Sequence, residues 1–261
     1  MVAKAPRGPV ILALMFTGVG VALLLNNFLL LEPFQVTALW PLLLVIVGAA
    51  VLVRGDFLPD DNARTFGITR GTVESATLEV NAGEIDLFLR DSDKEGRLIV
   101  GQYAAEARPV LEVQNTHAQL RLDRAAVRWL TFSDWQLALT PDLPWQLFVS
   151  SSIGQADFDL SHLIVEGGLI ASGTGDIRLV CPKETLAPLQ VRSAVGNIQV
   201  RTPLGYKSRI RVMPAPFFNV HVDLRRYVET EPNLYIARDG APDAPLVDLQ
   251  VRGTLGDLYL S

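Results

Sequence analysis

The sequence predicts a mainly β protein, with a two-helix transmembrane hairpin at the N-terminus and a repetitive β-solenoid-like domain behind it. Two long apolar segments, at residues 10–31 and 36–53, predict the hairpin. Beyond residue 65, apolar and polar residues alternate in short runs that a glycine interrupts at similar points. Period-two alternation is typical of half-buried β-strands, and regular recurrence is typical of stacked repeats. We therefore divide the chain into a hairpin at 1–54, a linker at 55–65 and a repetitive all-β domain at 66–261.

The two apolar segments match the thickness of a membrane. As helices of about 1.5 Å per residue they reach roughly 33 and 27 Å, close to a hydrocarbon core of about 30 Å. Glu32 is the single charged residue between positions 10 and 53, and Pro33 cannot continue the first helix, so residues 32–35 predict the turn. A secretory signal peptide has a shorter apolar region and a cleavage site of small residues. The pattern therefore predicts a cell-membrane protein that crosses the bilayer twice.

Charged residues beside the hairpin predict its orientation. Lys4 and Arg7 precede the first helix and Arg54 follows the second, whereas the turn carries no Lys or Arg. Because Lys and Arg gather on the cytoplasmic side, both termini and the β domain are expected in the cytoplasm. The net charge of −5 and the lack of a Lys/Arg cluster argue against nucleic-acid binding. Cys181 is the only cysteine, which excludes an intramolecular disulfide and a multi-cysteine metal site.

One pattern recurs through the β domain: an alternating strand, a short stretch of small residues, a glycine followed by a polar residue, and a second alternating strand. Residues 111–122 fit as a variant in which Ala118 takes the place of the glycine. Two successive steps between the glycines are both 21 residues long. We expect the glycines at corners that need a positive φ or a close backbone approach. These repeat corners are Gly83, Gly154, Gly175, Gly196 and Gly256.

The equal steps favour a solenoid, in which each coil covers the apolar face of its neighbour. The alternative is an antiparallel β-sandwich of hairpins, with Gly-Asp and Gly-Asn as the turns. The two folds differ in a simple way, because only the solenoid stacks Ile177 on Ile198. Residues 213–245 carry five prolines and break the pattern. We interpret them as an insertion before the last repeat, which would close the domain.

The polar residues that follow the repeat glycines allow two interpretations. In a solenoid they would form one column, made of Glu84, Gln155, Asp176, Asn197 and Asp257. The column could be a ladder of turn-capping side chains that bind local backbone amides. It could also be a carboxylate site that binds a cation or cleaves a sugar by acid catalysis. Two amides interrupt the acids, which favours the ladder.

Aromatic residues gather between positions 129 and 145, where three of the four tryptophans lie. We expect these residues to fill the end of a core or to cover a solenoid face, and the alternative is an interaction patch. The candidate patch consists of Trp129, Phe132, Trp135 and Trp145.

No motif for catalysis or for a cofactor stands out. The histidines, His117, His162 and His221, are far apart and form no metal-binding motif. The sequence contains neither a phosphate-binding loop of the Walker type nor a Gly-x-Ser-x-Gly nucleophile elbow. We therefore predict no catalytic, cofactor-binding or metal site, and no enzyme.

The second apolar segment contains the string LWPLLLVIVG at residues 39–48, which resembles the transmembrane region of LiaI–LiaF-type bacterial proteins. The glycine-punctuated repeats resemble the LiaF-like, toast-rack type of solenoid domain, which is also found in proteins regarded as adhesins. Together these resemblances cover most of the chain. They imply a bacterial cell-envelope protein that modulates envelope-stress signalling, and they supply no catalytic residues.

We therefore expect a non-enzymatic, membrane-anchored interaction or regulatory module of the bacterial cell envelope. Its partners would be the lipid bilayer and a membrane or envelope protein, such as a sensor kinase or a sibling envelope protein. One alternative is an adhesin-like structural protein, which requires the β domain to lie outside the cell. Another is an enzyme that acts on a glycan or lipid head group, which requires two carboxylates to converge in an open groove.

Overall fold

The computed structural model describes residues 64–103, 109–123 and 135–261, which form β-strands and the connections between them. The predicted hairpin at 1–54 lies outside the described residues, as does the linker up to residue 63. The first strand begins at Arg64, two residues before the predicted start of the β domain. Within the described ranges, no helix is long and apolar enough to cross a membrane.

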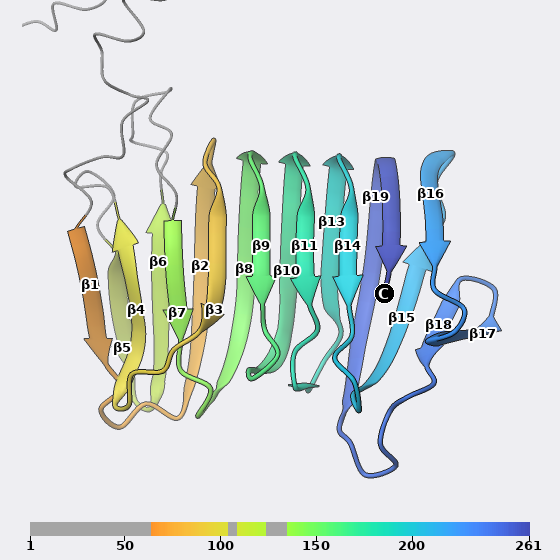
Figure 1. The fold of residues 1–261 in the computed structure, drawn as a ribbon. Helices are drawn as coiled ribbons and strands as arrows, with labels where there is room; N and C mark the ends of the chain where they lie inside the picture. The colour runs from red at the N-terminus through yellow and green to blue at the C-terminus, as the bar shows by residue number, and fades with distance from the viewer. Residues whose placement is uncertain (1–63, 104–108, 124–134) are drawn as a thin grey trace, which may run out of the picture. The chain divides into compact units, whose positions relative to one another are not determined.

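The strands lie in two layers that face each other across one core (Figure 1). The first layer contains β2 (Ser75–Gly83), β5 (Val110–Gln114), β6 (His117–Asp123), β8 (Pro144–Ile153), β10 (Ile164–Thr174), β12 (Glu184–Thr185), β13 (Leu189–Val195), β15 (Lys207–Met213), β17 (Tyr227–Glu231) and β18 (Leu234–Ala237). The second layer contains β1 (Arg64–Thr69), β3 (Leu87–Asp91), β4 (Arg97–Tyr103), β7 (Trp135–Leu139), β9 (Ala156–Asp159), β11 (Ile177–Val180), β14 (Ile198–Arg201) and β16 (Phe217–Val222). The long strand β19 (Leu246–Leu260) contributes its first half to the first layer and its second half to the second.

The central part of the domain is a stack of coils. A first-layer strand, a glycine corner and a second-layer strand make one coil, as in β8–β9, β10–β11 and β13–β14. Equivalent strands of these coils pair in parallel, and Ile177 is the direct partner of Ile198. A sandwich of hairpins would pair these strands antiparallel. The parallel register, in steps of 21 residues, is the one that a solenoid requires.

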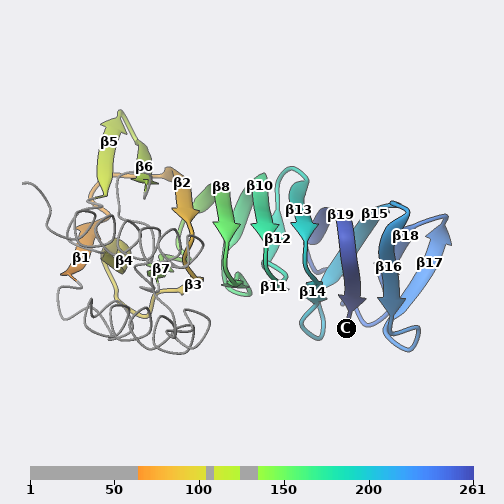
Figure 2. The ribbon, with the colours of Figure 1, turned by 90° about the horizontal axis from the view of Figure 1, so that it is seen from above.

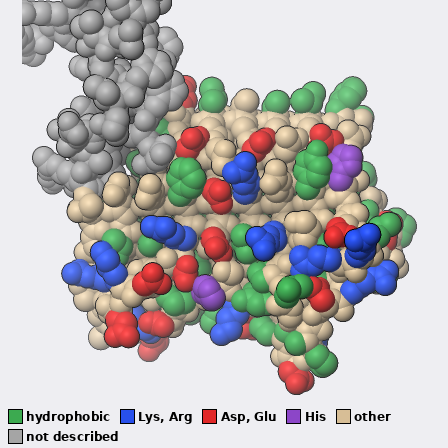
Figure 3. Space-filling view, viewed as in Figure 1, with side chains coloured by type: hydrophobic (Ala, Val, Ile, Leu, Met, Phe, Trp, Pro, Cys, Tyr) green, Lys and Arg blue, Asp and Glu red, His purple; other side chains and the backbone are tan. Residues whose placement is uncertain are grey.

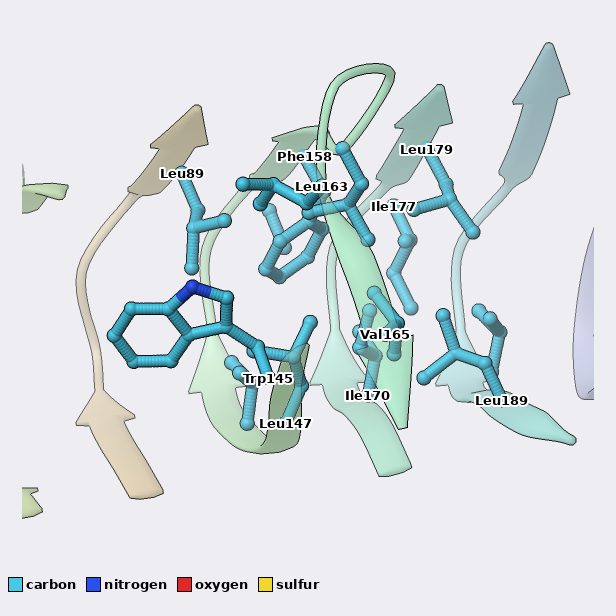
Figure 4. Close-up of a cluster of buried hydrophobic side chains, with 14 of the residues drawn as sticks. Leu89, Trp145, Leu147, Phe158, Leu163, Val165, Ile170, Ile177, Leu179 and Leu189 are labelled. Carbon is cyan, nitrogen blue, oxygen red and sulfur yellow. The ribbon is translucent and has the colours of Figure 1, made fainter. Parts of the chain in front are cut away.

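The core is built from the same inward position of each coil, repeated along the stack. Successive side chains of a strand point to opposite faces, so every second one lies between the two layers. There, β-branched and leucine side chains pack against the equivalent residues of neighbouring coils. Figure 4 shows this packing around Trp145, Phe158 and Ile170. One column, no more than 3% exposed at any position, runs through Leu122, Val80, Val149, Ile170, Val191, Val251 and Val212.

At both ends of the stack the coils depart from chain order. The coil β2–β3 lies between β6–β7 and β8–β9, and β19 lies between β13–β14 and β15–β16 (Figure 2). Leu249 of β19, for example, pairs with Leu189 on one side and with Ile210 on the other. The last repeat therefore does not close the domain as predicted, because a neighbour covers each of its sides.

The predicted insertion at 213–245 is wrong in part. Its strand β16 belongs to the coil stack, since Val220 pairs in parallel with Leu258 of β19. The hairpin β17–β18 is extra to the repeats, and β18 pairs antiparallel with β15 at the end of the first layer. Prolines flank these strands rather than interrupt them, which is why the proline count suggested one continuous insertion.

Residues 111–122 do not form the predicted variant coil. They lie in an antiparallel hairpin, β5–β6, whose turn holds Asn115 at a φ of 56°. Ala118 is not a corner residue, because it is buried within β6 beside Ala76 of β2. Alternation defines which side chains face inward but carries no information on strand direction, so the hairpin and the coil could not be distinguished from the pattern.

Candidate functional site

Four of the five repeat glycines form a column along one corner of the stack. Gly154, Gly175, Gly196 and Gly256 have φ values between 133° and 137°. A Cβ on any of the last three would come 2.0–2.3 Å from the carbonyl oxygen of the preceding glycine, well inside van der Waals contact. Any larger residue would therefore force neighbouring coils apart, and the column serves to let the coils stack.

Gly83 does not belong to this column. Its φ is 64°, and Ile85 takes the corner position instead, since its carbonyl oxygen lies 2.5 Å from where a Cβ on Gly154 would be. Asp86 then stands beside Gln155 and accepts a hydrogen bond from the Gln155 amide at 2.7 Å. The first member of the polar column is thus Asp86 and not Glu84. The prediction placed this corner at Gly83 because the other corners carry a glycine, whereas this coil turns at Ile85.

The polar column is a ladder whose hydrogen bonds run from one coil to the next. Asp176 Oδ1 accepts from the Asn197 amide at 2.8 Å, and Asn197 Oδ1 accepts from the Asp257 amide at 3.1 Å. Asp257 Oδ1 also accepts from Asn219 Nδ2 at 3.0 Å. These side chains satisfy backbone donors at the corner. In the part of the chain that the structure describes, no three His, Cys, Asp or Glu residues are arranged to hold a metal ion.

Two members of the candidate aromatic patch are core residues. Trp135 is 1% exposed and Trp145 is 0% exposed, and the indole N–H of Trp145 donates to the Thr140 carbonyl at 2.8 Å. Burial of both side chains agrees with the expectation that the aromatic residues fill a core, and it leaves neither indole open to a partner. The alternative, an interaction patch, is therefore wrong for Trp135 and Trp145. Trp129 and Phe132 lie outside the described residues.

The histidine contacts link neighbouring strands. His117 lies with Nδ1 2.8 Å from the Ser75 hydroxyl and Nε2 3.0 Å from the Thr77 hydroxyl. Both ring nitrogens are thus occupied by hydroxyl groups, and no carboxylate among the described contacts orients the ring as a catalytic base requires. His221 stacks on Tyr259 with ring centroids 5.0 Å apart, and its Nε2 lies 3.3 Å from Asp257 Oδ1.

A buried polar cluster lies at the edge of the stack opposite the glycine column. Cys181 Sγ lies 3.4 Å from the Thr202 hydroxyl, which accepts a hydrogen bond from the Tyr227 hydroxyl at 2.7 Å. Burial raises the pKa of both Cys181 and Tyr227 to about 12. The thiol is therefore protonated at neutral pH and shielded from solvent, which excludes a reactive thiolate at this position.

A shallow groove of about 510 Å³ lies on the outer face of the first layer, over β6, β2, β8 and β10. Phe148 and Leu169 line one part of it, and Phe148 is 40% exposed. The ion pair between Glu79 and Arg121, at 2.8 Å, lines another part. Apolar surface thus lies beside paired charges, an arrangement typical of a protein-binding surface.

The acids of this groove are engaged in hydrogen bonds. Glu79 accepts from Arg121 Nε and Gln119 Nε2, both at 2.8 Å, and the hydrogen bond from Arg121 lowers the pKa of Glu79. Asp123 accepts from Asn81 Nδ2 at 3.3 Å. An acid catalyst needs a raised pKa, so Glu79 is a poor proton donor near neutral pH.

A row of exposed apolar side chains follows the glycine column from coil to coil. Its apolar members are Ile153 (53% exposed), Val195 (42%), Leu255 (50%) and Phe217 (71%). They are successive strand partners, with Thr174 between Ile153 and Val195. Figure 3 shows hydrophobic side chains along this upper edge, where β8, β10 and β13 end in Figure 1. We call the five residues the corner ridge; at about 4.8 Å per strand it is roughly 19 Å long.

The corner ridge is not evident from the alternation of apolar and polar residues. Each member stands at a strand end, next to the corner, where alternation no longer separates inward from outward positions. The available signal was the position itself, because Ile153, Thr174, Val195 and Leu255 all directly precede a repeat glycine.

Comparison with known proteins identifies the fold. A proposed cell adhesion protein from Clostridium sporogenes has a TM-score of 0.63 at 16% identity, covering 76% of this chain and 97% of that chain. A proposed adhesin from Bacteroides fragilis aligns over 78% of this chain and 99% of that chain, with 10% identity and a TM-score of 0.30. No protein-family model matches the sequence, and no curated protein matches it. At this identity the likeness to the Clostridium protein shows a shared mainly β fold.

Proposed function

We propose that this protein is a non-enzymatic, membrane-anchored interaction module of the bacterial cell envelope. The apolar segments at 10–31 and 36–53 anchor the chain in the bilayer, and the coil stack presents a binding surface to a protein partner. The observation that carries the proposal is the groove on the outer face of the first layer, where a half-exposed aromatic side chain stands among fixed charges.

The geometry of this face suits protein binding. Exposed aromatic side chains and arginines are the residues that contribute most to protein interfaces. Phe148 projects from β8, which is paired with β10 on one side and with β2 on the other. The backbone of β8 is therefore already ordered, and little conformational entropy is lost on binding. A surface that is already ordered binds with a smaller entropic penalty than a flexible loop would.

The charges on the same face indicate the chemistry of the partner. Arg192 and Arg252 are neighbours in the parallel register, both exposed, and Arg192 adjoins Ala171, which lines the groove. Among the described residues, neither arginine forms an ion pair. Two adjacent guanidinium groups repel each other until an anion neutralises them. The partner that fits this face carries an apolar side chain flanked by acidic groups.

Two candidate roles differ in the side of the membrane on which the β domain lies. With the β domain in the cytoplasm, as the flanking Lys and Arg predict, the partner is a membrane protein such as a sensor kinase, and the module regulates envelope-stress signalling. With the domain outside, the role is that of an adhesin-like structural protein. The fold shared with the proposed cell adhesion protein favours the second role, and the charge asymmetry favours the first.

Site-specific photo-crosslinking in cells of the source bacterium tests the proposal. A photoreactive phenylalanine analogue replaces Phe148 in the full chain, and a matched variant carries it at Tyr259, which is also 40% exposed but lies on β19 in the second layer. We expect one discrete protein adduct at position 148 and none at 259, and Arg252→Glu should weaken the adduct. Equal crosslinking at both positions, or none at 148, would refute the proposed surface.

A further inference from the structure

The chain enters the β domain at the edge that carries the corner ridge. Four strands of the second layer run parallel to one another and away from the glycine corner, namely β11, β9, β3 and β7. Because β4 is antiparallel to β7 and β1 is antiparallel to β4, β1 also runs away from that edge. Its first residue, Arg64, therefore lies on the ridge edge, where β1 starts in Figure 1.

The connection to the predicted second transmembrane helix is short. Residues 54–63 separate the end of that apolar segment from Arg64. Ten residues span at most about 36 Å, even when fully extended. A connection of ten residues keeps the start of β1, which lies on the ridge edge, within this distance of a membrane anchor.

The corner ridge has the chemistry of a lipid-contacting surface. Its four large side chains are apolar and substantially exposed, and Thr174 is the one polar member. Asp176, which follows Thr174 by two residues, accepts a hydrogen bond from the Asn197 amide of the next coil. A contact of four side chains is too small to hold a free domain on a bilayer, but a tether makes the contact intramolecular and so raises its occupancy.

We propose that the corner ridge rests on the lipid surface, with Ile153, Val195, Leu255 and Phe217 in contact with the bilayer interface. This inference rests on the membrane anchor of the proposed function and adds a defined orientation: the strands stand on the membrane with the glycine corner down. The groove on the outer face of the first layer then points sideways, where it is open to a membrane-bound partner.

Fluorescent probes at the two edges of the stack test this orientation. An environment-sensitive fluorophore is attached to Val195→Cys in the full chain, reconstituted in phosphatidylcholine vesicles whose acyl chains are brominated. The matched variant is Leu204→Cys, because Leu204 is 78% exposed in the loop between β14 and β15, at the opposite edge. Cys181, the only native cysteine, is buried, so the unsubstituted chain serves as the unlabelled control.

The bromine atoms should quench the Val195 probe several times more strongly than the Leu204 probe. Adding Leu255→Asp and Phe217→Asp should abolish that difference while the chain still floats with the vesicles after a carbonate wash. Flotation with equal quenching at both edges, or persistent quenching in the aspartate variant, would overturn the orientation alone. A chain that fails to float would overturn the membrane anchor, and the orientation with it.

Discussion

Substitution of Gly196 tests the close approach of neighbouring coils at the glycine corner. At this residue the φ is 134°, and a Cβ would lie 2.3 Å from the Gly175 carbonyl oxygen and 2.7 Å from its carbon. Both atoms belong to backbone that is fixed by hydrogen bonds between coils, so they cannot move aside as a flexible side chain would. The Gly196→Ala change should therefore strain its own backbone and also push two coils apart.

The two effects can be estimated separately. An unfavourable φ for a residue with a Cβ costs about 1–3 kcal/mol. Forcing an extra methyl group into packed structure costs about 1–3 kcal/mol more. Gly196→Ala should thus lower the free energy of unfolding by about 2–6 kcal/mol, the sum of the two effects, and Gly196→Val by at least as much. Removing the neighbouring ladder side chain with Asn197→Ala should cost only about 0.5–1.5 kcal/mol, the net value of one hydrogen bond.

Urea denaturation of the β domain alone, residues 56–261, measures these differences by circular dichroism. We expect this fragment to fold, because the buried core extends from Val73 to Leu260. Gly205→Ala is the matched control, since the φ of Gly205 is 84° but nothing lies within 4 Å of its Cβ position. This control isolates the backbone strain from the clash. If Gly196→Ala and Gly205→Ala were equally destabilising, the argument from close coil stacking would fail.

Ile177 and Ile198 are parallel partners on neighbouring coils, so alanine at both positions should deviate from additivity by about 0.5 kcal/mol or more; strictly additive unfolding free energies would contradict their contact. Burial raises the pKa of Cys181 from 9.0 to about 12. The thiol thus ionises more readily in the unfolded chain, and stability that is complete below pH 9 should fall as the pH rises toward 12. Cys181→Ala should weaken this alkaline decline in the urea midpoint, and an unchanged slope would refute the assignment. Fused after Ser261, green fluorescent protein should fluoresce while alkaline phosphatase stays inactive; the opposite pattern would place the β domain outside the cell and favour the adhesin-like role.

The polar ladder illustrates how far sequence reasoning reached into the candidate site. The interpretation as a turn-capping ladder rested on Gln155 and Asn197, whose amides interrupt the acids. The structure shows side-chain oxygens bound to backbone amides as expected, but on the next coil rather than in the same turn. The groove around Phe148 was not predicted, because its residues come from four strands that are distant in the chain.

The positions of the strands and turns in the central coils can be read from the amino-acid sequence alone. Both follow from local requirements: alternation places Val191 inward and Arg192 outward, and only glycine fits at positions such as Gly196. A repeat of 21 residues then predicts which strands become neighbours, since equal coils stack with equal side chains in contact.

The order of the coils at the two ends and the direction of the hairpin β5–β6 became apparent only in the folded structure. Strands pair through backbone hydrogen bonds that are the same for every sequence, so alternation alone does not select the neighbour of a strand. The strand β2, for example, pairs in parallel with β6 on one edge and with β8 on the other. Which coil lies beside which is settled by long-range packing of the whole stack, and so is the exposure of the corner ridge.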